Sequence, residues 1–453
     1  MELPSRILKF RLDDIISLLI NPISGAIDTT PTKFFDKIPI SEEKRLFDRE
    51  YFLSESERVK KLENLKQVNK QYSQNVPYWF YVLTTLNCNF SCPICYERKT
   101  LNKSETNPET IDKVVETIDR FQEKHTIPNN RINIILFGGE PLCISNPYII
   151  NHILESSRQK NWKDVIVTNG SRVKKFIDLF SKYSETISDF RITLDGPQII
   201  HDSRRPYKKG RGSFDNVVDS IDLLLKNHLT VKMQTILGSG NIANFEELIS
   251  FVKDKGWLQD SYFQWRIEGS HDYVNLDPKK DEISEGNMVQ KLIQSWEKYG
   301  ELDGKIKFES FKYLGHIVRS FGWLGNYKTY WGPKYGFCEP QKGFHYVFST
   351  NGQIYHCPRT INNPNFQVGD TTNDLNSKNE ELKNGTILER EKCLPCSINT
   401  LCGGGCVVQR KYYSNFDCQK YALSVITEFV DLMKNKILER SNPNKIVSIN
   451  KLW

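Results

Sequence analysis

The stretch Cys88-Asn-Phe-Ser-Cys92-Pro-Ile-Cys95 carries three cysteines, separated by three and then two residues. It follows Tyr78-Trp-Phe-Tyr-Val-Leu-Thr-Thr85, an aromatic and β-branched run that predicts a β-strand. Three thiolates can bind three irons of a 4Fe–4S cluster, which leaves the fourth iron free to bind another molecule. The alternatives at this point are three unrelated cysteines or half of a zinc site.

Length and composition bound the kind of protein. The chain has 453 residues, of which 38% are hydrophobic, enough for two to three domains with a sizeable core. The net charge is +7, and the densest basic run, Arg204-Arg-Pro-Tyr-Lys-Lys-Gly-Arg211, indicates a solvated loop. We therefore expect no nucleic-acid partner.

The cysteine count points to a compartment and a chemistry. The N-terminus has no signal sequence, and no stretch approaches about 18 apolar residues, so we expect a soluble, cytoplasmic protein that does not enter a membrane. Disulfides are disfavoured in that compartment. The eleven cysteines, many at short spacings, are then expected to bind metal or clusters.

Strand-like and helix-like segments alternate from residue 78 to about 300. Helical spacing of apolar residues is clear over 214–225 and 245–252. The alternation predicts an α/β fold, with a parallel sheet covered by helices, and places function at the carboxyl ends of the strands. The six predicted strands are 78–85, 131–137, 164–168, 189–195, 230–237 and 262–267.

Glycine-containing polar turns follow the predicted strands. The second strand runs into Gly138-Gly139-Glu140-Pro141, the third into Asn169-Gly170, and the fourth into Asp195-Gly196-Pro197. Glycines allow a ligand to approach the backbone closely, and Glu140 can accept hydrogen bonds from an ammonium group. Each turn alone is an ordinary loop, but their occurrence together, after a cysteine triad, indicates a binding site.

The triad and these turns resemble the radical S-adenosylmethionine enzymes. The resemblance implies a partial six-stranded (β/α) TIM-like barrel, in which the open iron binds S-adenosylmethionine and an electron from the cluster releases a 5′-deoxyadenosyl radical. By this resemblance Cys88, Cys92 and Cys95 are the catalytic cluster ligands. It assigns the cofactor contacts to Gly138, Gly139, Glu140, Asn169, Thr193, Asp195 and Arg205, with Arg204 as the alternative arginine. Ile94 departs from the family, which usually has an aromatic residue there.

The C-terminal cysteines resemble the SPASM extension, which binds auxiliary iron–sulfur clusters in peptide-modifying enzymes. The resemblance implies one 4Fe–4S cluster on Cys393, Cys396, Cys402 and Cys418, and another on Cys338, Cys357 and Cys406. The total would be three 4Fe–4S clusters. Seven thiolates cannot fill two four-cysteine sites, so the second auxiliary cluster takes another ligand or has an open iron. Zinc on Cys393 and Cys396 is the alternative, and Cys143 is expected to be a small core residue.

These observations divide the chain into three predicted parts. Residues 1–75 form a small N-terminal module, interpreted as a winged-helix-like element that recognises a leader peptide, or as an elaboration that merely packs on the next domain. Residues 76–305 form the partial barrel, and residues 306–453 form the SPASM domain with a C-terminal helix from Tyr421. A hairpin is predicted around Asn351-Gly352.

The resemblance implies an enzyme that modifies peptides. The first hypothesis is a ribosomal-peptide maturase that abstracts hydrogen from a precursor peptide with a leader and forms a thioether, carbon–carbon or ether cross-link. Its electron donor would be a reductase or a flavodoxin-type protein. The alternatives are an anaerobic sulfatase-type maturase that forms formylglycine, and a non-catalytic iron–sulfur electron-transfer protein.

Overall fold

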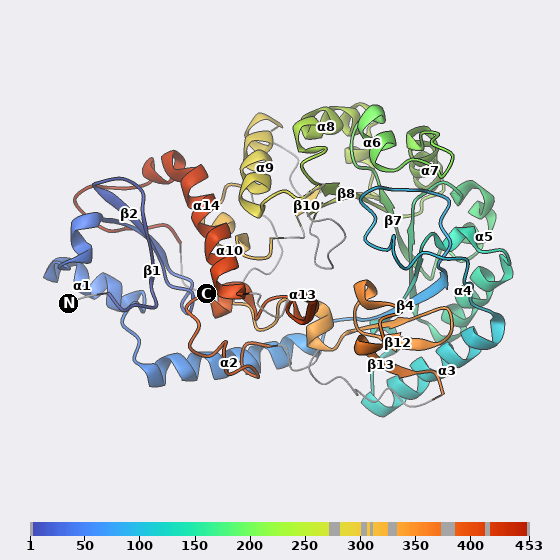
Figure 1. The fold of residues 1–453 in the computed structure, drawn as a ribbon, viewed down its shortest axis with the longest axis horizontal. Helices are drawn as coiled ribbons and strands as arrows, with labels where there is room; N and C mark the ends of the chain where they lie inside the picture. The colour runs from blue at the N-terminus through green and yellow to red at the C-terminus, as the bar shows by residue number, and fades with distance from the viewer. Residues whose placement is uncertain are drawn as a thin grey trace.

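A computed structural model gives the fold of the chain (Figure 1). It describes residues 3–270, 281–299, 306–308, 311–324, 333–372, 386–412 and 417–450.

The centre of the molecule is a ten-stranded sheet. Its strands run in the order β10-β9-β8-β7-β6-β5-β4-β11-β12-β13, and every neighbouring pair from β4 to β10 is parallel. The six predicted strands are all present, which confirms the predicted α/β fold with a partial six-stranded barrel. The parallel strands are β4 (Tyr78–Thr85), β5 (Ile132–Gly138), β6 (Lys163–Thr168), β7 (Ile187–Thr193), β8 (Val231–Leu237), β9 (Phe263–Gly269) and the short β10 (Ile306–Phe308).

The strand sequences explain how the sheet is buried. Every residue of β5 is buried, as expected for a strand covered on both faces. In β8 and β9, buried residues alternate with half-buried ones, so that Lys232, Gln234 and Glu268 share the face opposite to the one that packs under the helices. Polar side chains on that face give the barrel a polar interior.

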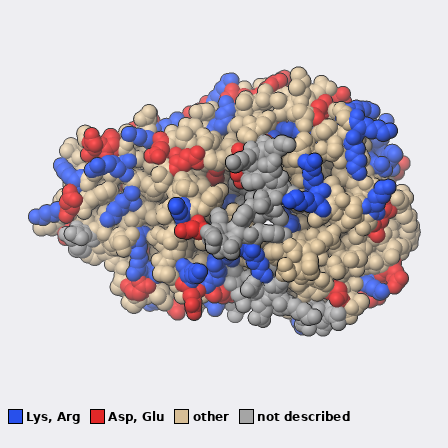
Figure 2. Space-filling view, in the orientation of Figure 1, with Lys and Arg blue, Asp and Glu red and all other residues tan. Residues whose placement is uncertain are grey.

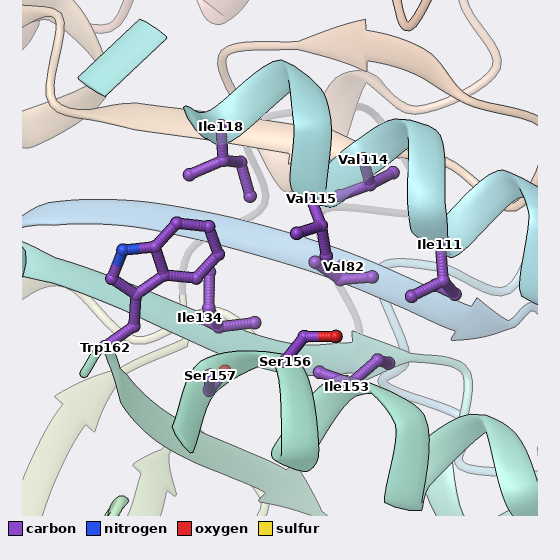
Figure 3. Close-up of a pocket in the computed structure, with 10 residues that line it drawn as sticks. All are labelled: Val82, Ile111, Val114, Val115, Ile118, Ile134, Ile153, Ser156, Ser157 and Trp162. Atoms are coloured by element: carbon purple, nitrogen blue, oxygen red, sulfur yellow. The ribbon is translucent and has the colours of Figure 1, made fainter. Parts of the chain in front are cut away.

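Helices cover the outer face of the barrel sheet. They are α3 (Pro108–His125), α4 (Tyr148–Lys160), α5 (Ile177–Lys182), α6 (Gln198–Arg204), α7 (Phe214–Lys226) and α8 (Phe245–Asp254). Figure 3 shows α3 and α4 packed against β4 and β5, with Ile118, Ile153 and Trp162 pointing into one gap. That gap measures about 10 Å³, about the space of one water, so the layer is close-packed rather than a binding site.

The C-terminal part continues the sheet past β4. β11 (His345–Phe348) pairs with β4 in parallel, and β12 (Gln353–Tyr355) and β13 (Gln367–Asp370) follow in antiparallel order. The predicted hairpin joins β11 to β12, and Gly352 adopts a φ of +80° in its turn. The pairing with β4 sets this cysteine-rich part beside the strand that leads into Cys88.

Two long helices close the other side of the barrel. α9 (Glu285–Tyr299) packs against α14 (Cys418–Leu438), which is the predicted C-terminal helix, and α10 (Gly315–Phe321) lies near them (Figure 1). The buried carboxylate of Glu285 accepts backbone N–H bonds from Tyr313 and Leu314 at 2.8–3.1 Å. Shorter helices α12 (Asn399–Cys402) and α13 (Val407–Tyr412) lie among the C-terminal cysteines.

The N-terminal residues form a second, antiparallel sheet. β1 (Leu8–Arg11), β2 (Ile16–Ile20) and β3 (Ile27–Pro31) are followed by α1 (Ile40–Asp48) and α2 (Glu55–Ser73). Ser54 caps α2: its N–H donates to the Glu57 carboxylate, and its hydroxyl accepts the Glu57 N–H. The helix α1 begins at Ile40, after Pro39, and no side chain caps it.

The fourth strand of this sheet comes from the far end of the sequence. β14 (Val447–Ser448) pairs antiparallel with β3, and Asn450 accepts the Ile27 N–H at 2.8 Å. The sequence analysis did not foresee this strand, because two residues give no periodicity. Residues near 447 therefore complete the N-terminal sheet. Across the described ranges, no helix combines the length and apolarity that a membrane crossing requires.

Candidate active site and cluster-binding cysteines

Cys88, Cys92 and Cys95 lie on one loop at the carboxyl end of β4. All three are partly exposed, and the Phe90 N–H donates to the Cys88 sulfur at 3.4 Å. Burial raises the pKa of the Cys95 thiol to about 12 and the pKa of Cys88 above its ordinary range. Thiols in such a place ionise only next to strong positive charge, which iron supplies. The donor set therefore fits an iron–sulfur cluster.

The Gly138-Gly139 turn lies against the residues that lead into the cysteine loop. The Gly139 N–H donates to Thr85 O at 3.0 Å, and the Glu140 N–H donates to Asn87 O at 2.9 Å. Gly138 has a φ of +139°, and a Cβ there would lie 2.1 Å from the Thr85 oxygen. This close approach of two backbones requires glycine.

Glu140 is buried beneath this turn and connects it to the end of β6. Its oxygens accept hydrogen bonds from the Thr168 hydroxyl and the Asn169 N–H, both at 2.6 Å, and from the Leu142 N–H at 3.1 Å. Burial raises the pKa of the Glu140 carboxyl to about 7, although these hydrogen bonds act to lower it. An ionised carboxylate has about four acceptor positions, so the three bonds leave room for an ammonium group.

Asn169 links the β6 turn to the cysteine loop. Its Nδ2 donates to Asn89 Oδ1 at 2.9 Å and lies 3.9 Å from the Cys88 sulfur. Its Oδ1 accepts the Ser171 hydroxyl, which in turn accepts from Asn89 Nδ2 at 2.8 Å. The sequence analysis missed Asn89 and Ser171, whose only signal was their position beside Cys88 and Asn169.

Thr193 ends β7, and Asp195 follows it, buried beneath two arginines. Arg205 Nε lies 2.8 Å from Asp195 Oδ2, and Arg204 Nε lies 3.4 Å from the same oxygen. Although burial acts to raise it, Arg205 and Arg204 hold the pKa of the Asp195 carboxyl below its ordinary value. Burial raises the pKa of Cys92, and Arg205 opposes that shift. Arg205 therefore lies between Asp195 and the cysteine loop.

Arg204, the alternative arginine, is bound elsewhere. Its two terminal nitrogens lie 2.5 and 2.9 Å from the oxygens of Asp281, and one also donates to Ile236 O at 3.0 Å. These contacts direct its charge into the protein, away from the cysteine loop. The geometry thus favours Arg205 for contact with a bound carboxylate.

Polar side chains from three strands line the barrel interior. Gln234 donates to Glu268 at 2.7 Å, and Lys232 pairs with Asp189 at 2.7 Å. Gln234 also lies opposite Thr193 in the β7–β8 register. The sequence analysis did not single these residues out, because alternating polar positions in a strand are usually solvent-facing.

The C-terminal cysteines fall into two groups, close enough to influence each other's ionisation. Burial raises the pKa of Cys338 to about 12 and of Cys357 to about 11, and Cys406 adds to both shifts. Burial likewise raises the pKa of Cys402 to about 12, with contributions from the thiols of Cys418 and Cys393.

Cys396 completes the second group. Burial is the main cause that raises the pKa of Cys396, and the thiols of Cys393 and Cys418 raise it further. Within the described ranges, no three His, Cys, Asp or Glu side chains converge on a single metal ion.

Cys143 is buried, as expected, but it does not lie in an apolar core alone. The Asn89 amide and the Glu140 carboxylate both act on its ionisation, so its sulfur lies beside the cysteine loop. It also lines a cavity of about 660 Å³ together with Arg172 and Lys175.

Comparison with known proteins defines the class of this fold and site. The Radical SAM superfamily matches residues 82–252, which span β4 to α8 and contain the cysteine triad and all the turns. The chain therefore contains a radical SAM domain at residues 82–252, and its fold resembles that of solved maturase structures. It is an enzyme, which rules out the non-catalytic electron carrier, and its class binds S-adenosylmethionine and a 4Fe–4S cluster.

Two of the similar proteins are sulfatase-maturating enzymes. The chain is 22% identical to the serine-type anaerobic sulfatase-maturating enzyme of Bacteroides thetaiotaomicron, over 80% of this chain and 92% of that enzyme. It is 25% identical to the cysteine-type enzyme of Clostridium novyi, over 71% of this chain and 85% of that enzyme.

Two solved structures share the fold. Native anSMEcpe with bound AdoMet and Cp18Cys peptide matches with a TM-score of 0.59 and 16% identity, covering 80% of this chain and 98% of its own. Streptococcus suis SuiB bound to precursor peptide SuiA matches with a TM-score of 0.54 and 15% identity, covering 91% of this chain and 97% of its own.

Proposed function

We propose that this enzyme is a radical SAM maturase that installs a thioether, carbon–carbon or ether cross-link in a ribosomally made precursor peptide. The observation that carries the proposal is the N-terminal module, in which three strands and two helices precede the barrel and β14 adds a fourth strand to the sheet. The SuiB match covers 91% of the chain, whereas the anSMEcpe match covers 80%. A peptide-recognition module ahead of the barrel suits an enzyme that must hold a leader.

The barrel residues would hold the cofactor and the reacting peptide. Cys88, Cys92 and Cys95 would bind the cluster, and S-adenosylmethionine on its open iron supplies the hydrogen-abstracting radical. Glu140 would accept the methionine ammonium, and Arg205 would pair with the methionine carboxylate. Gly138, Gly139, Asn169, Thr193 and Asp195 would complete the cofactor site. The Gln234–Glu268 pair would face the peptide from the barrel interior.

The seven C-terminal cysteines would hold two auxiliary 4Fe–4S clusters. Cys393, Cys396, Cys402 and Cys418 would fill one, and Cys338, Cys357 and Cys406 would leave one iron of the other without a cysteine. Arg359 lies 4.6 Å from the Tyr96 ring, next to Cys95, which connects this group to the radical site. Arg359 also acts on the ionisation of Cys357 and Cys406, so this cysteine group would lie near the radical site.

The leader would bind the N-terminal sheet by adding a strand. The strand order β1-β2-β3-β14 makes β1 and β14 the two outer strands of this sheet in the described structure, and β1, with four residues against two, is the longer edge. The Leu12 N–H donates to Ile16 O, and the alternation of an antiparallel ladder then turns the amides of Lys9 and Arg11 outward. We propose β1 as the docking edge.

A single proline tests this edge. Lys9→Pro removes an outward N–H and leaves the amides that face β2 in place. We expect precursor affinity, measured by calorimetry, to fall about tenfold, while Lys9→Ala retains it. Equal affinity in both variants would place the leader elsewhere.

A sulfatase-type maturase is the second candidate, and the curated relatives favour it. The two functions differ in product. Reduced, reconstituted enzyme with S-adenosylmethionine would be given a precursor encoded beside its gene and, separately, a sulfatase peptide. A product lacking two hydrogens that ignores a hydrazide reagent indicates a cross-link, whereas a hydrazide-reactive aldehyde indicates formylglycine. Absence of 5′-deoxyadenosine in every case would refute both. We also propose a cytoplasmic location and an external electron donor.

A further inference from the structure

The basic run of residues 204–211 divides into two parts in the structure. Arg204 and Arg205 turn inward to buried carboxylates, as described above. Lys208, Lys209 and Arg211 are exposed. The run is therefore more than a solvated loop, and its exposed half has no part in the proposed cofactor site.

The exposed half is bonded directly to the cysteine loop. The Ser91 N–H donates to Pro206 O at 2.8 Å, and the Lys208 N–H donates to Asn89 O at 3.0 Å. Ser91 and Asn89 lie between Cys88 and Cys92. Two backbone bonds in opposite directions fix the basic turn beside the three cysteines.

Ring packing and a tight turn strengthen this attachment. The rings of Phe90 and Tyr207 meet edge to face at 4.7 Å. The Tyr207 N–H donates to Arg211 O at 2.9 Å, and the Gly210 N–H donates back to Tyr207 O at 2.8 Å. A Cβ at Gly210 would meet nothing within 4 Å, so the tip projects into open space.

The positive charges of the turn face solvent without carboxylate partners in their described hydrogen bonds. Lys208 Nζ donates to the Asn87 amide oxygen at 3.3 Å, and Arg211 donates to the Asn216 amide oxygen at 3.2 Å. Neutral acceptors orient the two cations without cancelling their charge. The turn therefore places two uncancelled positive charges outside the cysteine loop.

A second turn adds to this surface. Arg172 follows the Asn169 turn. Burial raises the pKa of Tyr207, and Arg211 and Arg172 are both among the groups that lower it, so both arginines lie near this ring. Figure 2 shows Lys and Arg side chains gathered on the right-hand part of one face, over the region of α7. We name Arg172, Lys208, Lys209 and Arg211 the basic rim.

We propose that the basic rim is the docking surface for an acidic protein that carries one electron at low potential, such as a flavodoxin or ferredoxin. The inference rests on the proposed function, because the radical chemistry requires one electron for each cleavage. In the step at this surface the carrier loses one electron and the cluster gains it, and no bond forms or breaks. Opposite charge would steer the carrier to the loop that holds the cluster.

A nucleic acid fits this surface less well. Single-stranded nucleic acids need exposed aromatic rings on which bases stack. The aromatic ring of the turn, Tyr207, packs instead against Phe90. Electron delivery to the cluster would explain why the basic rim lies against the cysteine loop. Binding of a phosphate backbone would not require that location.

The test measures binding rather than turnover. Full-length, reconstituted enzyme is titrated with an oxidised acidic flavodoxin by calorimetry at low and at raised salt, without S-adenosylmethionine or peptide. In the variant Lys208→Glu/Lys209→Glu/Arg211→Glu we expect affinity to fall at least about tenfold at low salt, and the salt dependence to flatten. The matched control, Lys37→Glu/Lys44→Glu/Lys60→Glu, changes three exposed lysines at the opposite, N-terminal end of the molecule (Figure 1) and should bind as the parent does.

The outcomes separate this inference from the proposed function. Unchanged affinity and salt dependence in the rim variant overturn the inference, as does tighter binding of a short single-stranded RNA than of flavodoxin by the parent. Cleavage of S-adenosylmethionine driven by dithionite should survive in the rim variant, because no carrier is needed. If the parent itself shows no cleavage, the proposed function fails while the binding result stands. Should charge reversal prevent cluster loading, the neutral triple glutamine variant replaces it.

Discussion

Arg204 forms a two-point ion pair with Asp281, although the two residues lie 77 positions apart in the sequence. The side chains are 6% and 8% exposed, so the pair is buried. Its neighbour Arg205 instead reaches Asp195 and the cysteine loop. Two adjacent arginines therefore have separate tasks, one in holding the fold and one at the cofactor site.

Replacing each arginine should change a different property: the stability of the protein for Arg204, and cofactor affinity for Arg205. Arg204→Met leaves the buried Asp281 unpaired and should lower the free energy of unfolding by about 3–5 kcal/mol. Arg205→Met leaves Asp195 with Arg204 and the Ile236 N–H, so stability should change little. Its affinity for S-adenosylmethionine should fall about tenfold or more. Thermal unfolding and calorimetry distinguish the two, and a stable, non-binding Arg204→Met would reverse the assignment.

Glu140 should make cofactor affinity depend on pH. Burial raises the pKa of this carboxyl to about 7 in the cofactor-free protein. Below that pH it is mostly uncharged and binds an ammonium poorly. Affinity should therefore rise about fivefold from pH 6 to pH 7, a range in which an α-amino group stays charged.

The variant Glu140→Gln tests the origin of that dependence. Its amide does not titrate, so its affinity should be low and constant from pH 6 to pH 7. Calorimetry of reconstituted enzyme at several pH values measures both proteins. A parent with flat affinity, or a variant that keeps the slope, would assign the effect to another group.

Gly138→Ala should displace the end of β4. The new Cβ would lie 2.1 Å from Thr85 O, at a φ of +139°. We expect a loss of about 1–3 kcal/mol in the free energy of unfolding and a lower iron content, because the shift reaches Cys88. Gly256→Ala is the control: its φ is also positive, at +70°, but no atom lies within 4 Å of the added Cβ. Equal iron in both variants would contradict the argument.

Iron content should report the three cysteine groups separately. Three 4Fe–4S clusters give about twelve irons and about twelve sulfides per chain. Cys393→Ala/Cys396→Ala and Cys338→Ala/Cys357→Ala should each leave about eight. Cys143→Ala should leave the count unchanged, because it is assigned to no group. An unchanged count in either double variant would show that its cysteines bind no cluster.

Local sequence patterns were sufficient to predict the barrel. Each strand from β4 to β9 is marked by its own aromatic or β-branched run, and each glycine turn by its own residues. The Gly138 turn illustrates why: the constraint is steric and acts on the residue itself. The short spacings within the cysteine motifs likewise identified residues that the fold gathers into three places.

The sequence did not reveal contacts between distant segments. Asp281 gives no sign that it pairs with Arg204, nor does Lys208 show that its amide binds Asn89. Gln234 and Glu268 meet only because β8 and β9 are in register. Such pairs are set by topology, and their members have ordinary local sequences.

The strand β14 has a consequence for how the molecule is made. Ile27 and Asn450, which bond to each other, are 423 positions apart. During synthesis, β3 must therefore leave the ribosome long before its neighbour exists, and its edge stays uncovered while the barrel and the cysteine-rich part emerge. The N-terminal sheet can be completed only after residues 447–448 have been synthesised. A chaperone or a partner peptide able to pair with a strand would find that edge open during this interval.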